Sequence, residues 1–144
     1  MFEVRRMLEA ALVKRLCSEI TDGQVAELRA HLRIELEAVR RTDVPGRTRL
    51  LADFHVVLAR LAGNEVLAHM LGDLLSRSSL IALMYQSSHS AEHSQDEHVA
   101  LVDAIERRDA RAAMRLMEQH LTHVENNLRL HARVSNLESA LQPD

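Results

Sequence analysis

The chain has 144 residues, of which 47% are hydrophobic and 27% charged, so it can form one domain with a continuous core and is too apolar for a disordered chain. A formal net charge of −3 and an aromatic content of 2% argue against a basic or base-stacking nucleic-acid surface on this chain. Glycine and proline are scarce, at four and two residues, which favours long helices over a β fold with many turns.

Apolar residues recur at helical spacing along most of the chain and predict six helices. The first covers residues 3–20, and the second covers about 22–40 with Thr21 or Asp22 as its N-cap. Residues 41–46 (RTDVPG) are predicted as a loop, because proline and glycine interrupt the pattern. The predicted apolar stripe of the first helix consists of Val4, Leu8, Ala11, Leu12 and Leu16.

The third and fourth helices are predicted at 47–62 and 65–85, with Gly63 and Asn64 as a C-cap pair that can adopt positive φ. Residues 86–95 (QSSHSAEHSQ) are expected to form a polar linker, and the fifth helix starts at Ala91 or Ser94 and ends near residue 107. Asp109 caps the sixth helix, which runs to about residue 134 before a tail, 135–144, that is expected to fray. Short connections favour antiparallel neighbours, so the chain is expected to be an all-α, single antiparallel bundle of about six helices.

The single cysteine, Cys17, excludes an internal disulfide and fits a reducing compartment, and we expect it to be a small buried residue. No apolar run reaches 18 residues, and the N-terminal MFEVRRMLEA carries charges where a signal peptide needs an apolar stretch. These features favour a cytoplasmic protein.

Three of the nine histidines lie on predicted apolar stripes, each on a different helix. His55 lies four residues after Leu51 and three before Leu58. His98 precedes Leu101, Val102 and Ile105 by three, four and seven residues, and His120 lies three after Met117 and four before Val124. The sequence therefore predicts three inward-facing imidazoles. The remaining six, His31, His69, His89, His93, His123 and His131, are assigned to polar flanks, the linker or the helix end.

Buried imidazoles need polar partners, and two alternatives remain open from spacing alone. Each ring could bond a backbone carbonyl as an ordinary core residue, or the three rings could share one divalent metal. His123, beside the stripe and three residues after His120, is a candidate partner of such a site. No carboxylate is expected on the buried faces as a general base.

Three segments, FEVRRMLEAALVKRL, FHVVLARLAGN and EHVALVDAIERRDARAAMRLMEQHL, resemble the FCD domain, which is the effector-binding domain of FadR-type regulators in the GntR family of bacterial transcription factors. The resemblance covers nearly all of residues 1–134 and implies a helical bundle with a central pocket. Many such domains bind a divalent metal through one Asp and three His, and His55, His98 and His120 match the three His. The Asp position is Leu51 in this chain, and Asp53 lies about 200° around the helix from it. The loss of an anionic ligand favours Zn or Ni over Fe or Mn.

The resemblance also implies a function. We expect a ligand-sensing domain that binds a small organic acid, such as lactate, a sugar acid, citrate or a fatty acyl thioester, and that forms a homodimer. The family's DNA-binding winged helix-turn-helix does not precede these residues. The sequence is therefore either a shortened form or a stand-alone sensor, and DNA binding belongs to the missing part. Arg5, Arg77 and Asn127 are candidate effector contacts, because arginine forks bind carboxylates.

Two other functions stay open. A metal held by three His with free coordination positions could support hydrolysis or oxygen chemistry, as in a helical-bundle enzyme. A metal-free helical interaction module is the second alternative, with the histidines bonded to the backbone. Ordinary surface pairing is the alternative role for Arg5 and Arg77, with Glu9 as the partner of Arg5, and Asn127 is alternatively a residue at the helix edge.

Overall fold

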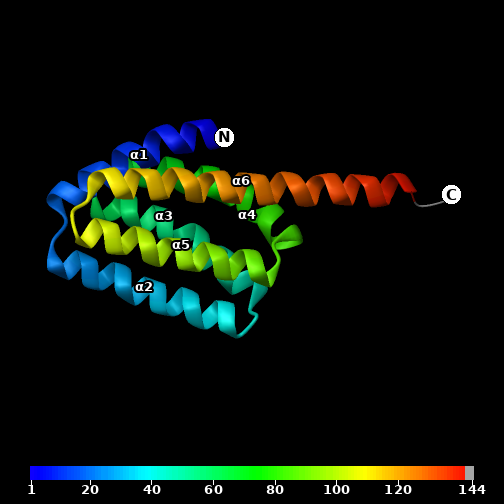
Figure 1. Cartoon of the computed structure of the whole chain (residues 1–144), viewed down its shortest axis with the longest axis horizontal. Helices are drawn as coiled ribbons and strands as arrows, with labels where there is room; N and C mark the ends of the chain where they lie inside the picture. Colours follow the sequence, from blue (N-terminus) through cyan, green and yellow to red (C-terminus); the bar gives the residue numbers. More distant parts are fainter. Residues whose placement is uncertain (142–144) are drawn as a thin grey trace.

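The computed structural model describes residues 1–141, and their side chains except those of residues 83–85 and 130–141. This part of the chain forms six helices and no strand, which confirms the all-α prediction (Figure 1). The helices are α1 (Phe2–Glu19), α2 (Asp22–Arg40), α3 (Val44–Leu61), α4 (Glu65–Tyr85), α5 (Ser88–Glu106) and α6 (Ala110–Leu141).

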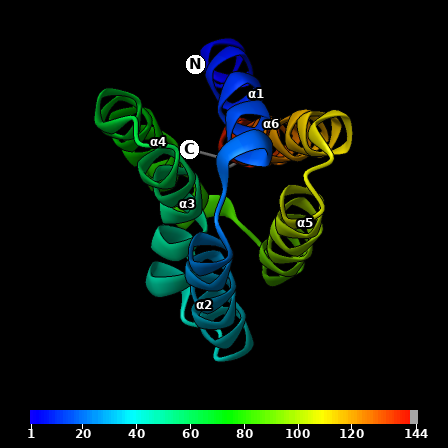
Figure 2. The same ribbon diagram turned by 90° about the vertical axis from the view of Figure 1, so that its left-hand side faces the viewer.

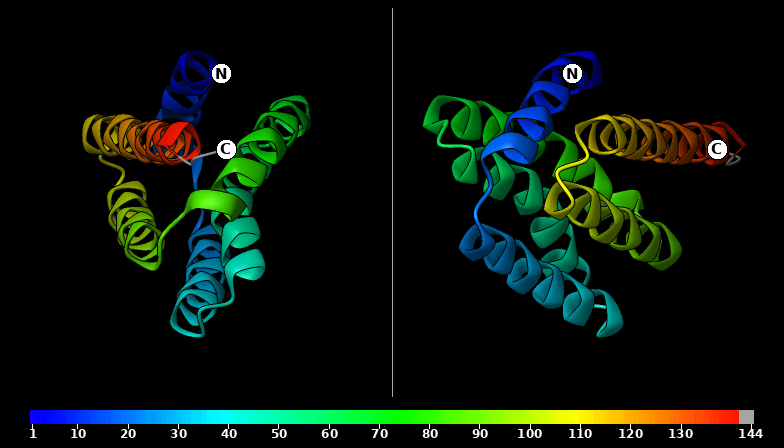
Figure 3. Two further views of the ribbon diagram at one scale, coloured as in Figure 1. Left: turned by 90° about the vertical axis from the view of Figure 1, so that its right-hand side faces the viewer. Right: turned by 60° about the vertical axis from the view of Figure 1, so that its left-hand side comes forward.

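The six helices pack side by side around a common interior, as the end-on view in Figure 2 shows. Helix α1 lies against α6, α3 lies against α4, and α2 contacts both α3 and α5. Helix α5 also packs along α6, so α3, α5 and α6 all face the centre of the bundle. Helix α6 extends well beyond the other five helices, as Figure 1 and the right-hand view of Figure 3 show. Among the described residues, no helix combines the length and apolar character needed to span a lipid bilayer.

Polar caps set most helix starts, and one of them corrects the predicted loop at 41–46. Thr21, one of the two predicted N-caps, caps α2 and forms a capping box with Gln24. Asp43 accepts a hydrogen bond from the Gly46 amide, so α3 begins at Val44 and not at residue 47. Pro45 is compatible with this start, because a helix needs no amide donor in its first turn.

The predicted linker at 86–95 is wrong for most of its length, because α5 begins at Ser88. The Ser87 side chain accepts a hydrogen bond from the Ser90 amide and caps the helix. Ser94 and Gln95 are buried, and the Gln95 amide donates to the Leu32 carbonyl oxygen across the α2–α5 contact. These polar residues resemble a linker in sequence, whereas in the fold they belong to a helix, and Gln95 serves as a buried hydrogen-bonding group.

Two further helix ends differ from the predictions. Gly63 has the predicted positive φ of 75°, whereas Asn64 accepts a hydrogen bond from the Leu67 amide and caps the start of α4. Helix α6 runs to Leu141, past the predicted end near residue 134, so the expected tail is helical up to that residue. The prediction for residues 142–144 lies outside the described residues.

Helix α1 turns a different face to the core than its apolar pattern predicts. Val4 is 44% exposed, whereas Arg5 and Glu9 are buried at 2% and 0% exposure. The inward face also carries Phe2, Leu12, Val13, Leu16 and Cys17, which confirms the buried position predicted for the cysteine. This orientation brings an arginine and a carboxylate into the bundle, next to the predicted histidines.

Candidate metal centre

The structure brings His55, His98 and His120 together in the interior of the bundle. They come from α3, α5 and α6, and each is at most 3% exposed. The Nε2 atom of His120 lies 3.1 Å from Nε2 of His98 and 3.3 Å from Nε2 of His55. Three ring nitrogens from three helices therefore meet around one point, with all three lying within 4.8 Å of one another.

A carboxylate contacts the opposite nitrogen of each of these rings. The Nδ1 atom of His98 lies 3.0 and 3.1 Å from the two oxygens of Glu35, and Nδ1 of His120 lies 3.1 Å from Oε1 of Glu97. Nδ1 of His55 likewise contacts Oε1 of Glu9. The three carboxylates come from α1, α2 and α5, so every helix except α4 contributes to this arrangement.

The carboxylates determine which ring nitrogen carries the proton. An ionised carboxylate only accepts hydrogen bonds, so each Nδ1–H must donate to it, and a neutral ring then has its lone pair on Nε2. Three lone pairs consequently point at one another across about 3 Å, an arrangement that is repulsive unless a cation or a proton lies between them. Carboxylate–histidine pairs of this kind fix ring orientation and raise the basicity of metal-binding imidazoles. The residues present thus suit a divalent transition metal.

Two of the carboxylates are fully buried and have additional cationic or polar partners. Oε2 of Glu9 accepts a hydrogen bond from Nε of Arg5 at 2.8 Å. Oε1 of Glu35 lies 3.3 Å from Nε2 of His31, which also contacts the Leu50 carbonyl oxygen at 2.9 Å. Buried charges need such pairing to offset the loss of water. His31 is therefore part of the support for His98, beyond the flank position assigned to it.

The pKa shifts agree with ionised Glu9 and Glu35 carboxylates and with neutral His55 and His120 rings at neutral pH. Burial by itself would raise the pKa of Glu9, but His55 and Arg5 outweigh it and lower the pKa to about 2. Burial also opposes the shift at Glu35, where His98 and His31 lower the carboxyl pKa. Burial lowers the pKa of His55, and it lowers the pKa of His120 to about 3 despite the neighbouring Glu97. Neutral imidazole is the form that binds metal.

Two residues next to the histidines complete their surroundings without offering a ligand. Phe54, which is fully buried, stacks on the His98 ring with centroids 4.0 Å apart and fixes the plane of that ring. Leu51 is buried one helical turn before His55, at the position where the resemblance implies Asp, and Asp53 is exposed. Among the described residues, the inner cluster is thus restricted to three nitrogen ligands, and Leu51 would offer no ligand to a metal held there.

A cavity of about 60 Å³ adjoins the three histidines. Its polar lining comes from Arg5, Thr48, Ser78, Ser79, Gln86 and Ser94, and its apolar lining includes Leu51, Leu75, Val124 and Leu128. Among the described residues, Oε1 of Gln86 is buried without a hydrogen-bond partner. The cavity can therefore offer a small ligand both donors and an unused acceptor.

The three predicted effector contacts lie at different places. Arg5 lines the cavity and at the same time pairs with Glu9, in a buried pair and not on the surface. Arg77 is exposed on α4, and Asn127 is half-buried on α6; neither lines this cavity. The structure thus brings Arg5 to the histidines and leaves the other two away from them.

The expectation that no carboxylate joins the buried faces is wrong, because Glu9 and Glu35 are fully buried beside the histidines. A signal for Glu35 exists in the sequence, since it lies three residues after Leu32 and four before Val39, on the inward stripe of α2. Glu9 similarly precedes Leu12 and Val13 by three and four residues. Both positions follow the spacing rule that identifies the histidines.

Comparison with known proteins agrees with the FCD resemblance noted in the sequence. The family model for the FCD domain matches residues 1–123. A protein named HTH-type transcriptional repressor NanR from Citrobacter rodentium is 30% identical over 125 residues, covering 85% of this chain and 47% of that protein. A NanR from Escherichia coli K12 is 32% identical over 127 residues, with the same coverage of both chains.

A third relative has a different name. HTH-type transcriptional repressor RspR from Escherichia coli K12 is 24% identical over 127 residues, which cover 88% of this chain and 56% of that protein. The chain thus spans about half the length of the curated relatives it matches.

Proposed function

The chain belongs to the FCD domain family, and from that membership we propose that it is the effector-binding domain of a GntR/FadR-type transcription regulator. Its relatives are named as helix-turn-helix transcriptional repressors and are about twice as long as the matched region. In this proposal DNA is bound by a domain outside these residues. In the same proposal the protein acts in the cytoplasm as a homodimer.

The domain binds one divalent transition metal through Nε2 of His55, His98 and His120. The observation that carries this proposal is the pattern of contacts: three Nε2 atoms converge, and every Nδ1 contacts a carboxylate. Only nitrogen is offered to the metal, which suits Zn or Ni better than Fe or Mn. When bound, the metal would supply a positive charge and open coordination positions for an anionic ligand.

The effector is a small carboxylate that occupies the cavity beside the histidines. The cavity is small, at about 60 Å³, so an acid of lactate size suits it better than citrate or a fatty acyl thioester. Arg5 provides a cationic partner for the carboxylate, and Oε1 of Gln86 can accept a hydrogen bond from a hydroxyl group. The proposal assigns no contact to Arg77 or Asn127, because they lie away from the cavity.

Signalling follows from the number of helices that meet at this cavity. Its lining comes from α1, α3, α4, α5 and α6, together with Gln86 between α4 and α5. An acid that fits one arrangement of these helices better than another shifts the balance between the two. The size of the shift is limited by the difference in affinity for the two arrangements. In the longer protein this change would alter how two DNA-binding domains are held.

A thermal-shift panel tests this function. Protein without a histidine tag is analysed for bound metal and then melted with a series of carboxylic acids, with Zn²⁺ or Ni²⁺ and with chelator. An acid at 100 times its Kd should raise the free energy of unfolding by about 2.7 kcal/mol, and only with metal present. Absence of both metal binding and any acid response would favour a metal-free interaction module. Turnover of simple esters or phosphates would favour the enzyme alternative.

A further inference from the structure

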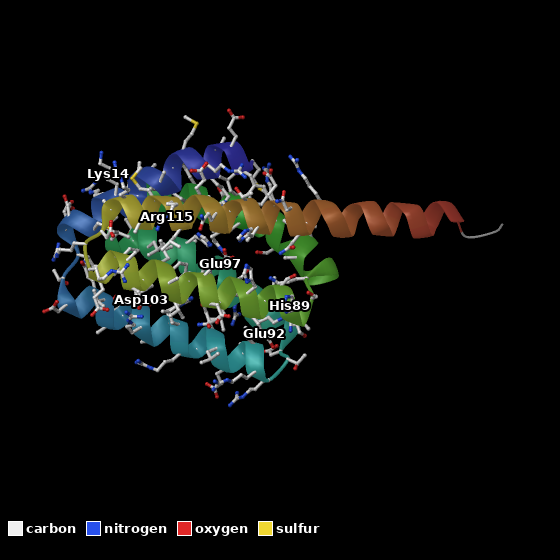
Figure 4. The ribbon with its side chains drawn as sticks, viewed as in Figure 1. Lys14, His89, Glu92, Glu97, Asp103 and Arg115 are labelled. Atoms are coloured by element: carbon white, nitrogen blue, oxygen red, sulfur yellow. The ribbon has the colours of Figure 1, made fainter. Side chains whose placement is uncertain are left out.

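A second group of metal-ligating side chains lies on the surface where α5 runs along α6. It consists of His93 and Glu97 of α5 and His123 of α6, and their ligand atoms lie within 4.8 Å of one another. Both histidines are about half exposed, and Glu97 is 16% exposed. Figure 4 labels Glu97 on α5, next to α6, and His89 nearer the start of α5. The metal proposed for the interior does not use these two histidines.

The positions of the three side chains follow from helix geometry. His93 and Glu97 are four residues apart, so they occupy the same face of α5 in successive turns. His123 reaches this face from α6, and its Nδ1 lies 2.7 Å from Oε2 of Glu97. Nε2 of His93 lies 3.8 Å from Oε1 of Glu97, and the two imidazole rings have centroids 5.3 Å apart. Small rotations about the exposed side-chain bonds suffice to direct all three ligand atoms at one ion.

We propose that His93, Glu97 and His123 form a second binding site for a divalent transition metal, which joins α5 to α6 at the protein surface. Two imidazoles and one carboxylate are a ligand set suited to Zn²⁺, Ni²⁺ or Co²⁺, and water fills the remaining positions. The site binds more weakly than a buried one, because the exposed histidines lose rotamer freedom when they bind. This site stands on its own geometry and does not require the interior metal.

Glu97 belongs to both groups, and this sharing links the two sites. Its Oε1 contacts Nδ1 of the buried His120, while its Oε2 contacts Nδ1 of the exposed His123. A cation at Oε2 draws charge from the carboxylate and weakens the support that it gives to His120. The two cations also repel each other. This coupling rests on the proposed interior metal. Binding of a metal at either site therefore weakens binding at the other, by the same factor in both directions.

Titration of the tag-free chain with Ni²⁺, followed by calorimetry and by metal analysis after desalting, tests the site. We expect each chain to bind two equivalents of Ni²⁺, one tightly and one more weakly. His93→Ala and His123→Ala should each remove the weaker equivalent and leave the tight one. His89→Ala, an exposed histidine on the same helix, is the matched control and should still bind two equivalents.

The possible results separate this inference from the proposed function. Loss of the only equivalent in His93→Ala and His123→Ala would support the surface site and overturn the interior one. If both variants bind as many equivalents of Ni²⁺ as the unchanged chain, whether one or two, the surface site is overturned. Glu97→Gln tests the link: it should weaken both equivalents, whereas His123→Ala should not weaken the tight one. A Glu97→Gln variant that affects only the weaker equivalent would overturn the coupling.

Discussion

Glu35 contacts Nδ1 of His98 with both of its carboxylate oxygens, at 3.0 and 3.1 Å, across the contact between α2 and α5. Both residues are almost completely buried, and the pair brings together positions 63 residues apart in the chain. The carboxylate fixes the proton on Nδ1 and thereby leaves Nε2 of His98 free to act as an acceptor. Glu35, which lies outside the convergent Nε2 atoms, thus sets the protonation and orientation of His98, which supplies one of them.

We therefore expect Glu35→Gln to weaken metal binding by about 10–100-fold, the range typical of losing a carboxylate behind a histidine ligand. Gln keeps the shape of the side chain but lacks the charge that makes the imidazole more basic. The affinity for Zn²⁺ is measured by competition with a chelator of known strength. Glu27→Gln, an exposed site on the same helix, is the control and should bind as tightly as the unchanged chain. Equal affinities in the two variants would contradict this role of Glu35.

His98→Ala should abolish tight metal binding, because it leaves two nitrogen ligands from α3 and α6 and opens a gap beside Phe54. The test is metal content after desalting, together with the melting temperature with and without Zn²⁺. The metal-dependent rise in melting temperature should shrink to the part that the weaker surface site contributes, whereas His69→Ala, an exposed histidine on α4, should retain the full rise. An undiminished rise in His98→Ala would show that the tight metal is held elsewhere. Circular dichroism checks that the variant is still folded.

Arg5→Lys separates effector binding from metal binding. Lysine keeps the positive charge near Glu9 but loses the planar fork that pairs with a carboxylate. We expect the acid-dependent thermal shift to decrease and the metal-dependent shift to remain. Arg77→Lys is the matched control, because Arg77 is exposed and lies away from the cavity, so its acid response should not change. An equal decrease in both variants would rule out Arg5 as the carboxylate partner.

Helical periodicity was sufficient to predict six helices and three inward histidines, because each feature depends on neighbours within one helix. It placed the start of α3 too late, since proline is compatible with a first helical turn capped by Asp43. It also missed the first turns of α5. Ser94 and Gln95 are buried there; Ser94 lines the cavity, and Gln95 donates a hydrogen bond to the Leu32 carbonyl oxygen. Polarity in the sequence thus does not by itself indicate a loop.

The same rules place the carboxylates on inward faces but do not identify the residues that they contact. Glu9 and Glu35 have inward spacing, yet a carboxylate at such a position is normally assigned to the surface unless a partner is known. Their partners His55 and His98 lie 46 and 63 residues further along the chain, on other helices. Periodicity describes one helix at a time, so it identifies which residues face inward and leaves open which of them meet.

Acidification should destabilise the metal-free protein, beginning below neutral pH. The pKa of His120 is about 3 in the folded state, because the ring is buried, and about 6.5 in an unfolded chain. Between these values the unfolded chain binds more protons, so the free energy of unfolding falls as the pH decreases. Each such group contributes at most about 1.4 kcal/mol per pH unit.

Protonation of Glu9 also lowers the free energy of unfolding, but at lower pH. Its pKa is about 2 when folded and 4.5 in the reference state, so the stability it provides is complete above pH 4.5 and is lost as the pH falls towards 2. Urea unfolding of the chelator-treated protein at pH 7, 6 and 5 covers part of the range between the folded and unfolded pKa values of His120. The free energy of unfolding should decrease across this series, because the lowered pKa values of His55 and His120 outweigh His31, whose pKa is raised by Glu35 and the Leu50 carbonyl despite burial. His120→Asn, which has no titrating ring, should show a shallower decrease than the unchanged chain. An equally steep decrease in the two proteins would contradict the role assigned to His120.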